Sequence, residues 1–291
     1  MYADDLVLLS ESHTGLQTSI NRLKLYCEKW KLKVNLNKTK ILIFNKGGHK
    51  FARFSFTYDN LQLEIVQNYC YLGIDFTAAG TLTAALNKLK EKAHKALFKF
   101  REHAFNNNIR LALKLFKTLI IPILTYASEV WGPFLIHNMN DSNFMTLCDK
   151  TPIENVNIRF CRYVLGVHRK SCNAAVRGEL GQYPILLIGL CHSLKYWSSL
   201  HVCDPNSLIS LCLKENYNLL RTDNQCWVKC IKTLLSNCGL HNIWNNLGGI
   251  NIHKSVFTLR KKMESLYNTA WFKLINGEGK VSNKLKTYCQ F

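Results

Sequence analysis

The chain has 291 residues, 47% of them hydrophobic, which is enough for about two domains with a buried core. Lys and Arg number 38 against 19 Asp and Glu, so the formal charge is +19. This excess favours a polyanionic partner such as nucleic acid, although a basic, solvated exterior on an unrelated protein has the same composition.

Targeting signals and cysteine usage argue against the secreted and membrane-spanning classes. The chain does not open with a charged segment followed by an apolar one, and its apolar runs stay below the ~18 residues of a membrane span. The 12 cysteines have irregular spacings and lie mostly among apolar residues, where a free thiol acts as a small hydrophobe. We therefore expect a soluble, intracellular protein, with the nucleus among its compartments and with neither a membrane nor a disulfide-linked partner.

Two adjacent carboxylates, Asp4 and Asp5, precede the apolar run 6–9. Like charges side by side prefer solvent or a cation. At the tip of a strand–turn–strand unit they would hold Mg²⁺, which takes carboxylate oxygens and organises phosphoryl displacement; a solvated turn is the alternative. Such a unit needs a strand on each side, and only three residues precede Asp4, so we expect the first strand to be missing.

The first 79 residues mix strand and helix patterns. Residues 1–10 read as a strand, and Ser12 or Thr14 caps a helix predicted over 14–31. Its apolar positions recur at helical spacing: Leu16, Ile20, Leu23 and Cys27. Further strands are predicted over 41–44, 54–57, 61–65 and 69–76. The second and third of these form a hairpin, because the intervening Asp59 and Asn60 tolerate positive φ.

From Gly80 onward the pattern is helical. One apolar stripe comprises Leu82, Leu86, Leu89, Ala93, Leu97 and Phe100. The opposite side of this helix carries Lys88, Lys92, Lys95 and Lys99. Lysines at this spacing either contact phosphates without reading bases or face water. Basic residues continue beyond them at Arg101, Arg110, Lys114 and Lys117. A second helix over 109–131 is expected to be bent or stepped at Pro122.

Beyond Thr151 the sequence predicts only helices. They span about 152–166, 171–179, 184–201, 205–221, 223–238 and 251–276. Linkers are expected near 77–81 and 132–151, because the latter is polar and contains Asn and Asp. The fold class is therefore α+β: a small antiparallel sheet with a helix, followed by an all-helical region.

Four segments occur in an order found in one family. Tyr2-Ala3-Asp4-Asp5 resembles its Y-x-D-D motif, and residues 32–40 (LKVNLNKTK) resemble the palm motif that follows. Residues 69–74 (YCYLGI) resemble its "YLG" primer-grip motif, and residues 124–132 (LTYASEVWG) resemble a segment after its thumb. The chain thus resembles the C-terminal portion of LINE-type (non-LTR retrotransposon) reverse transcriptases, with recognisable motifs up to about residue 135.

The resemblance implies a domain plan and an activity. Residues 1–79 would be a partial palm, 80–135 a thumb-like helical region, and 150–291 a helical C-terminal region. The family's activity is RNA-directed DNA polymerisation with Mg²⁺, using an RNA template, a DNA primer and dNTP.

It also implies roles for individual residues. Asp4 and Asp5 would bind metal and serve catalysis, and Lys38 or Lys40 would help pyrophosphate leave. Contacts to nucleic acid would come from Tyr2, Tyr71, Leu72, Gly73, Lys88, Lys92, Lys95 and Lys99. The alternatives are a charged loop before a buried strand for Lys38, and a simple bulge at Gly73.

The family's chemistry needs a third carboxylate, which relatives carry on an upstream palm strand. With that strand and the fingers missing, we expect no polymerisation by this chain alone. Two other interpretations stay open: a non-catalytic nucleic-acid-binding remnant or domesticated protein, and a decayed reading frame in which Met1 is the first available start.

A zinc site is a further alternative near the C-terminus. Cys226, Cys230, Cys238 and His241 are spaced in a way that attracts notice, since some LINE-type proteins end in a zinc knuckle. Their spacing departs from such knuckles, and Cys226 and Cys230 also fit the apolar side of a helix. Packing is the simpler interpretation.

Overall fold

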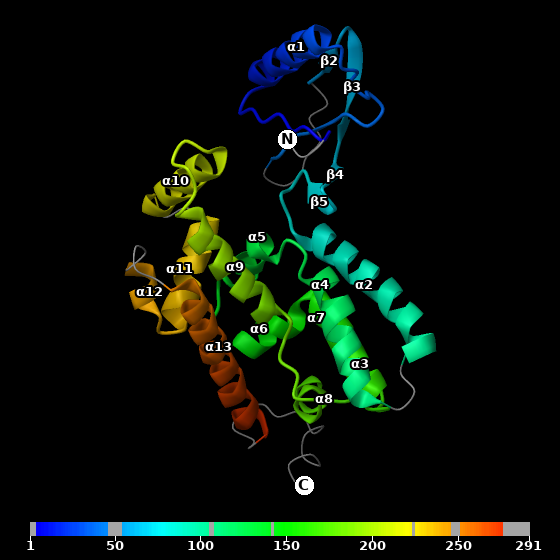
Figure 1. The fold of residues 1–291 in the computed structure, drawn as a ribbon, viewed down its shortest axis with the longest axis vertical. Coiled ribbons are helices and arrows are strands. Elements are labelled where there is room, and N and C mark those ends of the chain that lie inside the picture. Colours follow the sequence, from blue (N-terminus) through cyan, green and yellow to red (C-terminus); the bar gives the residue numbers. More distant parts are fainter. Residues whose placement is uncertain are drawn as a thin grey trace. The chain divides into compact units, whose positions relative to one another are not determined.

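The fold is described from a computed structural model, which covers residues 4–45, 54–104, 108–140, 143–222, 225–245 and 251–275 (Figure 1). The chain forms two compact units that meet in the sequence between Ala85 and Leu86. We call them unit 1, residues 1–85, and unit 2, residues 86–291, and describe each by itself. Unit 1 mixes helix and strands and unit 2 is helical, which confirms the α+β prediction.

Unit 1 begins with helix α1, His13–Trp30. The Ser12 hydroxyl accepts a hydrogen bond from the Gly15 backbone N–H at 3.1 Å, so it caps the helix as predicted. The helix ends at Lys31, whose φ of 51° is left-handed.

A three-stranded sheet lies beside α1. Its strands are β1, Lys40–Leu42; β2, Phe56–Tyr58; and β3, Leu61–Val66. β3 is central, antiparallel to β2 and parallel to β1, so this sheet is mixed and the prediction of an antiparallel sheet was wrong for β1. The turn between β2 and β3 has φ of 50° at Asp59 and 64° at Asn60, which confirms the predicted hairpin.

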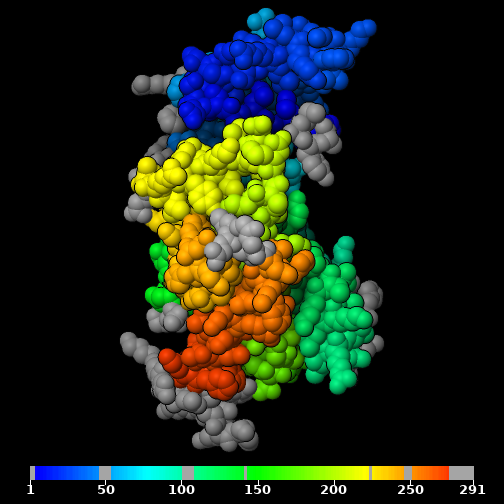
Figure 2. Space-filling view, turned by 60° about the vertical axis from the view of Figure 1, so that its left-hand side comes forward, coloured from blue at the N-terminus to red at the C-terminus, as the bar shows by residue number. Residues whose placement is uncertain are grey.

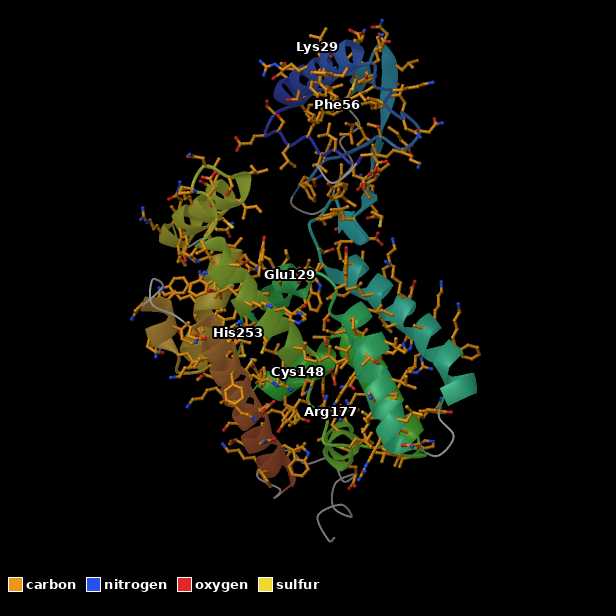
Figure 3. All side chains as sticks on the ribbon, viewed as in Figure 1. Lys29, Phe56, Glu129, Cys148, Arg177 and His253 are labelled. Carbon is orange, nitrogen blue, oxygen red and sulfur yellow. The ribbon has the colours of Figure 1, made fainter. Side chains whose placement is uncertain are left out.

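The small core of unit 1 joins the helix to this sheet. Ile20 of α1 packs with Ile41, Phe56 and Leu63 of the three strands, and all four are buried. Phe56 lies between α1 and the sheet (Figure 3). The apolar spacing of α1 therefore serves the role that its sequence predicts.

Residues 69–76 form two strands, so the predicted single strand was wrong. β4, Asn68–Tyr71, pairs antiparallel with β5, Ile74–Thr77, as a separate two-stranded sheet. The chain reverses at Leu72 and Gly73, whose φ values are 47° and 81°. Leu-Gly is an unusual pair for this turn, because a branched apolar residue rarely adopts positive φ, and sequence patterns therefore miss it.

The predicted strand over residues 1–10 was also wrong for its described part. Asp4 lies in a turn, Asp5 forms an isolated bridge, and residues 6–10 have no regular secondary structure. Leu6, Val7 and Leu9 are exposed. An apolar run becomes a strand only where a neighbouring strand accepts its backbone hydrogen bonds, and 6–10 lie in neither sheet of the described chain.

Unit 2 contains most of helix α2, Thr83–Ala104, followed by a helix broken into pieces. The pieces are α3, Ile109–Leu115; a π-helical turn, Phe116–Ile120; α4, Ile121–Leu124; α5, Ser128–Trp131; and a 3₁₀ turn, Gly132–Ile136. Pro122 stands in the first turn of α4, where its missing N–H is tolerated, and the irregularity falls on the turn just before it. The predicted step at Pro122 is thus confirmed as a π-helical turn.

The predicted linker over 132–151 was wrong. Helix α6, Phe144–Lys150, occupies its second half, and Ile136, Phe144 and Cys148 are fully buried. The polar residues that suggested a linker instead close a turn, because Asn140 and Asn143 exchange side-chain to backbone hydrogen bonds of 2.9 Å.

The remaining helices of unit 2 follow the predicted order. They are α7, Pro152–Val164; α8, Asn173–Glu179; α9, Leu186–Leu200; α10, Leu208–Arg221; α11, Trp227–Asn237; and α13, Ile252–Ile275. A short helix, α12, His241–Asn245, was not predicted. α9 packs against α5 and α13, and α10, α11 and α13 form much of the face of unit 2 seen in Figure 2.

Within the described ranges, no single helix has both the length and the hydropathy of a membrane span. The segments Ile109–Leu124 and Ser128–Ile136, bent by 66° against each other, reach those values only together.

Candidate nucleic-acid and metal site

Asp4 and Asp5 stand exposed at the start of unit 1, in a turn and an isolated bridge. Neither carboxylate forms an ion pair with a residue in the described ranges. Their oxygens are hard donors of the kind that Mg²⁺ prefers. Tyr2, which was predicted to contact nucleic acid, lies outside the described residues.

Two carboxylates alone do not enclose a metal ion. Across the described part of the chain, no group of three or more His, Cys, Asp or Glu side chains is placed to hold one. Asp4 and Asp5 therefore fit a divalent ion by donor type, and they need at least one further ligand to form a two-metal centre.

The loop before β1 separates the two candidate lysines. Lys40 Nζ forms an ion pair with Glu64 Oε2 at 2.6 Å, because the parallel pairing of β1 and β3 sets these residues side by side. Lys38 is exposed, and its backbone N–H donates to the Asn35 carbonyl at 3.1 Å in a turn. Of the two, Lys38 is the side chain left available to a ligand.

The hairpin β4–β5 is bonded to this same loop. The Tyr69 hydroxyl donates to the Lys38 carbonyl oxygen at 3.1 Å. Tyr71 and Gly73 are half-buried and Leu72 is exposed at the turn. The structure thus joins two of the segments that the sequence singled out, the Lys38 loop and the Tyr71–Gly73 turn, through one tyrosine.

The lysine row lies on α2, which belongs mostly to unit 2. Leu86, Leu89 and Ala93 are buried on one side of this helix. On the other, Lys88 is half-buried, and Lys92, Lys95 and Lys99 are exposed. The row forms a continuous basic face along the helix, suited to contacts with phosphates at regular spacing.

The four residues of the zinc alternative do not form a metal site. Cys226, Cys230 and Cys238 are each buried, within α11 or directly at its ends, and they are not among any group of three metal-binding side chains in the described chain. The Cys226 thiol donates to the Asn216 carbonyl at 3.4 Å. Burial raises the pKa of the Cys230 thiol to about 11, as expected for a cysteine that packs in an apolar interior.

A buried ionic network in unit 2 was not foreseen. Arg177 of α8 is fully buried, and its Nη1 lies 2.8 Å from Glu154 Oε1 and its Nη2 2.7 Å from Asp149 Oδ1. Its Nε donates to the Tyr267 hydroxyl at 2.9 Å. Glu154 also accepts from the Ile185 backbone N–H at 2.9 Å.

Because the network is buried away from water, the pKa values of its members are shifted. Burial raises the pKa of Glu154, and the positive charge of Arg177 opposes that rise. Burial likewise raises the pKa of Tyr267 to about 12. The residues of this network come from four helices, α6, α7, α8 and α13. Because they are far apart in the sequence, no local motif or spacing predicts the network.

Comparison with known proteins bears on the first unit. The family model described as reverse transcriptase (RNA-dependent DNA polymerase) matches residues 1–76. This match covers Asp4, Asp5, the Lys38 loop and the Tyr71–Gly73 turn together. Residues 1–76 are therefore similar to reverse transcriptases.

A relative extends the similarity. An uncharacterized transposon-derived protein of Caenorhabditis elegans is 26% identical over 132 residues, which are 45% of this chain and 47% of that protein. The matched part thus spans about half the length of that relative. No solved structure matches the chain. The similarity of residues 1–76 to reverse transcriptases is therefore a similarity of sequence. The arrangement of the candidate residues comes from the geometry described above.

Proposed function

We propose that this chain is part of a LINE-type retrotransposon reverse transcriptase, an RNA-directed DNA polymerase that uses Mg²⁺. The observation that carries the proposal is the match of residues 1–76 to the family, with the exposed Asp4–Asp5 pair at the family's Y-x-D-D motif. The transposon-derived relative from Caenorhabditis elegans supports a mobile-element origin.

Each candidate residue has its own role in the proposed reaction. Asp4 and Asp5 would hold Mg²⁺, which would neutralise charge on the phosphates. Lys38, free of the ion pair that occupies Lys40, would protonate the departing pyrophosphate or stabilise its negative charge. Tyr71, Leu72 and Gly73 hold the primer strand near the Lys38 loop, to which Tyr69 ties them.

The 291 residues alone should not catalyse polymerisation. A two-metal centre needs ligands besides Asp4 and Asp5, and the described residues bring no third acid or histidine to them. Polymerisation therefore requires a further carboxylate, which a longer polypeptide or a second chain would supply. We propose an intracellular location for such an assembly, with the nucleus as the compartment that holds its DNA primer.

Primer extension tests both statements. The purified 291-residue chain, given an RNA template, a DNA primer, dNTP and Mg²⁺, should yield no extended product, and strong synthesis would overturn the need for a third carboxylate. A polypeptide that adds the in-frame coding sequence upstream of Met1 should extend the primer. In it, Asp4→Asn with Asp5→Asn should abolish synthesis, and retention of activity would refute the polymerase assignment.

A second candidate function is binding of nucleic acid without catalysis. The exposed lysines of α2 and the formal charge of +19 favour it. It predicts a steep salt dependence of binding, because phosphate contacts release counterions. It also predicts that binding is indifferent to Asp4→Ala with Asp5→Ala, whereas a flat salt response would count against it.

A further inference from the structure

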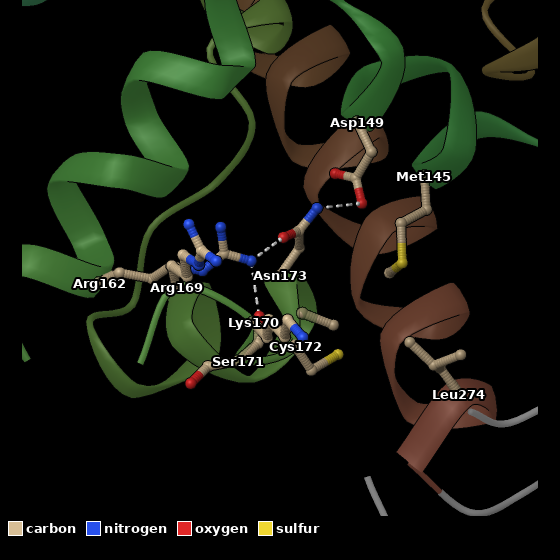
Figure 4. Close-up of a pocket in the computed structure, with 10 residues that line it drawn as sticks. Met145, Asp149, Arg162, Arg169, Lys170, Ser171, Cys172, Asn173 and Leu274 are labelled. Carbon is tan, nitrogen blue, oxygen red and sulfur yellow. Dashed lines mark hydrogen bonds between the residues drawn. The ribbon is translucent and has the colours of Figure 1, made fainter. Parts of the chain in front are cut away.

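A cavity of about 410 Å³ opens on unit 2, beside α6, α7 and the end of α13 (Figure 4). Its volume is within the range of small-molecule sites. The polar part of its lining is formed by Asp149, Arg162, Arg169, Lys170, Ser171 and Asn173. Met145 and Leu274 form an apolar wall.

The one carboxylate of this lining is already neutralised. Asp149 Oδ1 lies 2.7 Å from Arg177 Nη2, and its Oδ2 accepts from Asn173 Nδ2 at 3.2 Å. Arg177 itself is fully buried and is not part of the lining. Arg169 and Lys170 are exposed and form no ion pair with any residue in the described ranges. The cavity therefore presents a positive charge that nothing in its lining cancels.

Arg162 is held in place at the cavity. Its Nη2 donates to the Ser171 carbonyl at 2.6 Å and to Asn173 Oδ1 at 2.7 Å, and Asn173 stands between it and Asp149 (Figure 4). These bonds fix the plane of the guanidinium. Its Nε is buried without an acceptor among the described residues. A buried donor that lacks an acceptor costs free energy of folding.

We propose that this cavity binds a nucleoside phosphate. The phosphate would lie against Arg162, Arg169 and Lys170, because guanidinium forks and a lysine match its several acceptor oxygens. The sugar or base would pack on Met145 and Leu274. The site uses no residue of the reverse transcriptase segment, so it goes beyond the proposed function and stands or falls apart from it.

Alkylation of Cys172 gives a readout inside the cavity, since this half-buried thiol belongs to its lining. Cys212 of α10 is exposed and outside the cavity, so it serves as the internal reference. With the full chain, AMP or a single-stranded oligoadenylate should slow iodoacetamide labelling of Cys172 severalfold, measured by peptide mass spectrometry, and leave Cys212 unchanged. Protection by AMP means that a free nucleotide suffices, and protection by the strand alone means that the ligand is a nucleotide within a strand. Absence of protection by both overturns the proposal.

Charge-matched variants separate the cavity from general attraction to a basic protein. Arg169→Gln with Lys170→Gln removes two exposed charges of the lining and should raise the AMP concentration that half-protects Cys172 about tenfold or more. Arg159→Gln with Lys195→Gln removes two exposed charges of unit 2 outside the lining and should leave protection nearly unchanged. Equal losses in the two double variants would overturn the proposal.

Discussion

Arg177 is the residue on which the interior of unit 2 depends most directly. Its guanidinium meets Glu154, Asp149 and Tyr267, which come from three other helices. Replacing one partner of a buried ion pair leaves the other charge without compensation. We expect Arg177→Met to lower the free energy of unfolding by about 3–5 kcal/mol, measured by urea unfolding. Arg159→Met, on the exposed side of α7, is the control and should cost under about 0.5 kcal/mol.

The loss caused by Arg177→Met should depend on pH, because Glu154 would lose the charge that holds its pKa down. Its pKa in the folded variant would then rise further above the unfolded value. A carboxyl with a raised folded pKa is more stabilising when protonated, so the deficit should shrink as the pH falls from about 7 to about 5. Adding Glu154→Gln should remove this dependence. A deficit equal at both pH values would contradict the assigned role of Glu154.

Lys38, just before β1, and Lys40, its first residue, show why single side chains were only partly predictable. Sequence reasoning identified the segment but could not choose between Lys38 and Lys40. The choice follows from the parallel register of β1 and β3, which sets Lys40 opposite Glu64 across 24 positions of sequence. Register depends on tertiary pairing, so it leaves no trace in local spacing.

At the scale of the element, the β4–β5 hairpin depends on the backbone of Gly73. Its φ of 81° is open to glycine and strained for a β-branched residue. Gly73→Val should therefore cost about 1–3 kcal/mol locally and open the hairpin. Amide hydrogen exchange of residues 68–77 should therefore be faster in Gly73→Val than in the wild type. Asn60→Gly, at a φ of 64° in the β2–β3 turn, is the matched control and should leave the exchange of that turn nearly unchanged. Equal exchange of residues 68–77 in the wild type and in Gly73→Val would refute the dependence of the hairpin on Gly73.

The basic face of α2 gives a second prediction at this scale. Changing Lys92, Lys95 and Lys99 to Gln should reduce the slope of log K against log salt by about 0.9 for each duplex phosphate that the protein no longer neutralises. Fluorescence anisotropy with an RNA–DNA duplex measures it. Gln at Lys195, Lys214 and Lys254, all exposed and on other helices, makes the same change in net charge. If both triple variants shift the slope equally, α2 has no special role in binding.

Elements with their own local signals were predicted, and those that depend on distant partners were not. The β2–β3 hairpin followed from alternating residues around Asp59–Asn60, and α1 followed from its cap and apolar spacing. Residues 6–10 have the composition of a strand but lie in neither sheet. Helix α6 was missed because the Asn residues just before it suggested a linker. Both misses arise because composition reports propensity, whereas pairing and burial are decided by the rest of the fold.

At the scale of the whole molecule, the two units differ in how much they bury. The core cluster that joins α1 to the sheet of unit 1 has four buried residues, and the strands β1 and β2 are three residues long. In unit 2, α9 alone contributes nine buried residues, among them the fully buried Trp197. Because burial of apolar surface is the main source of stability, the units should not resist opening equally.

We therefore expect the amides of unit 1 to exchange through a sub-global opening of lower free energy than those of unit 2. Native-state hydrogen exchange, read by mass spectrometry in low urea, should show α1 and β3 exchanging well before α9 and α13. Opening of α1 and β3 should respond to urea together, since Ile20 and Leu63 share one core. Equal free energies of opening in α1 and α9 would mean that the chain unfolds as one cooperative body, and would contradict two independently stabilised units.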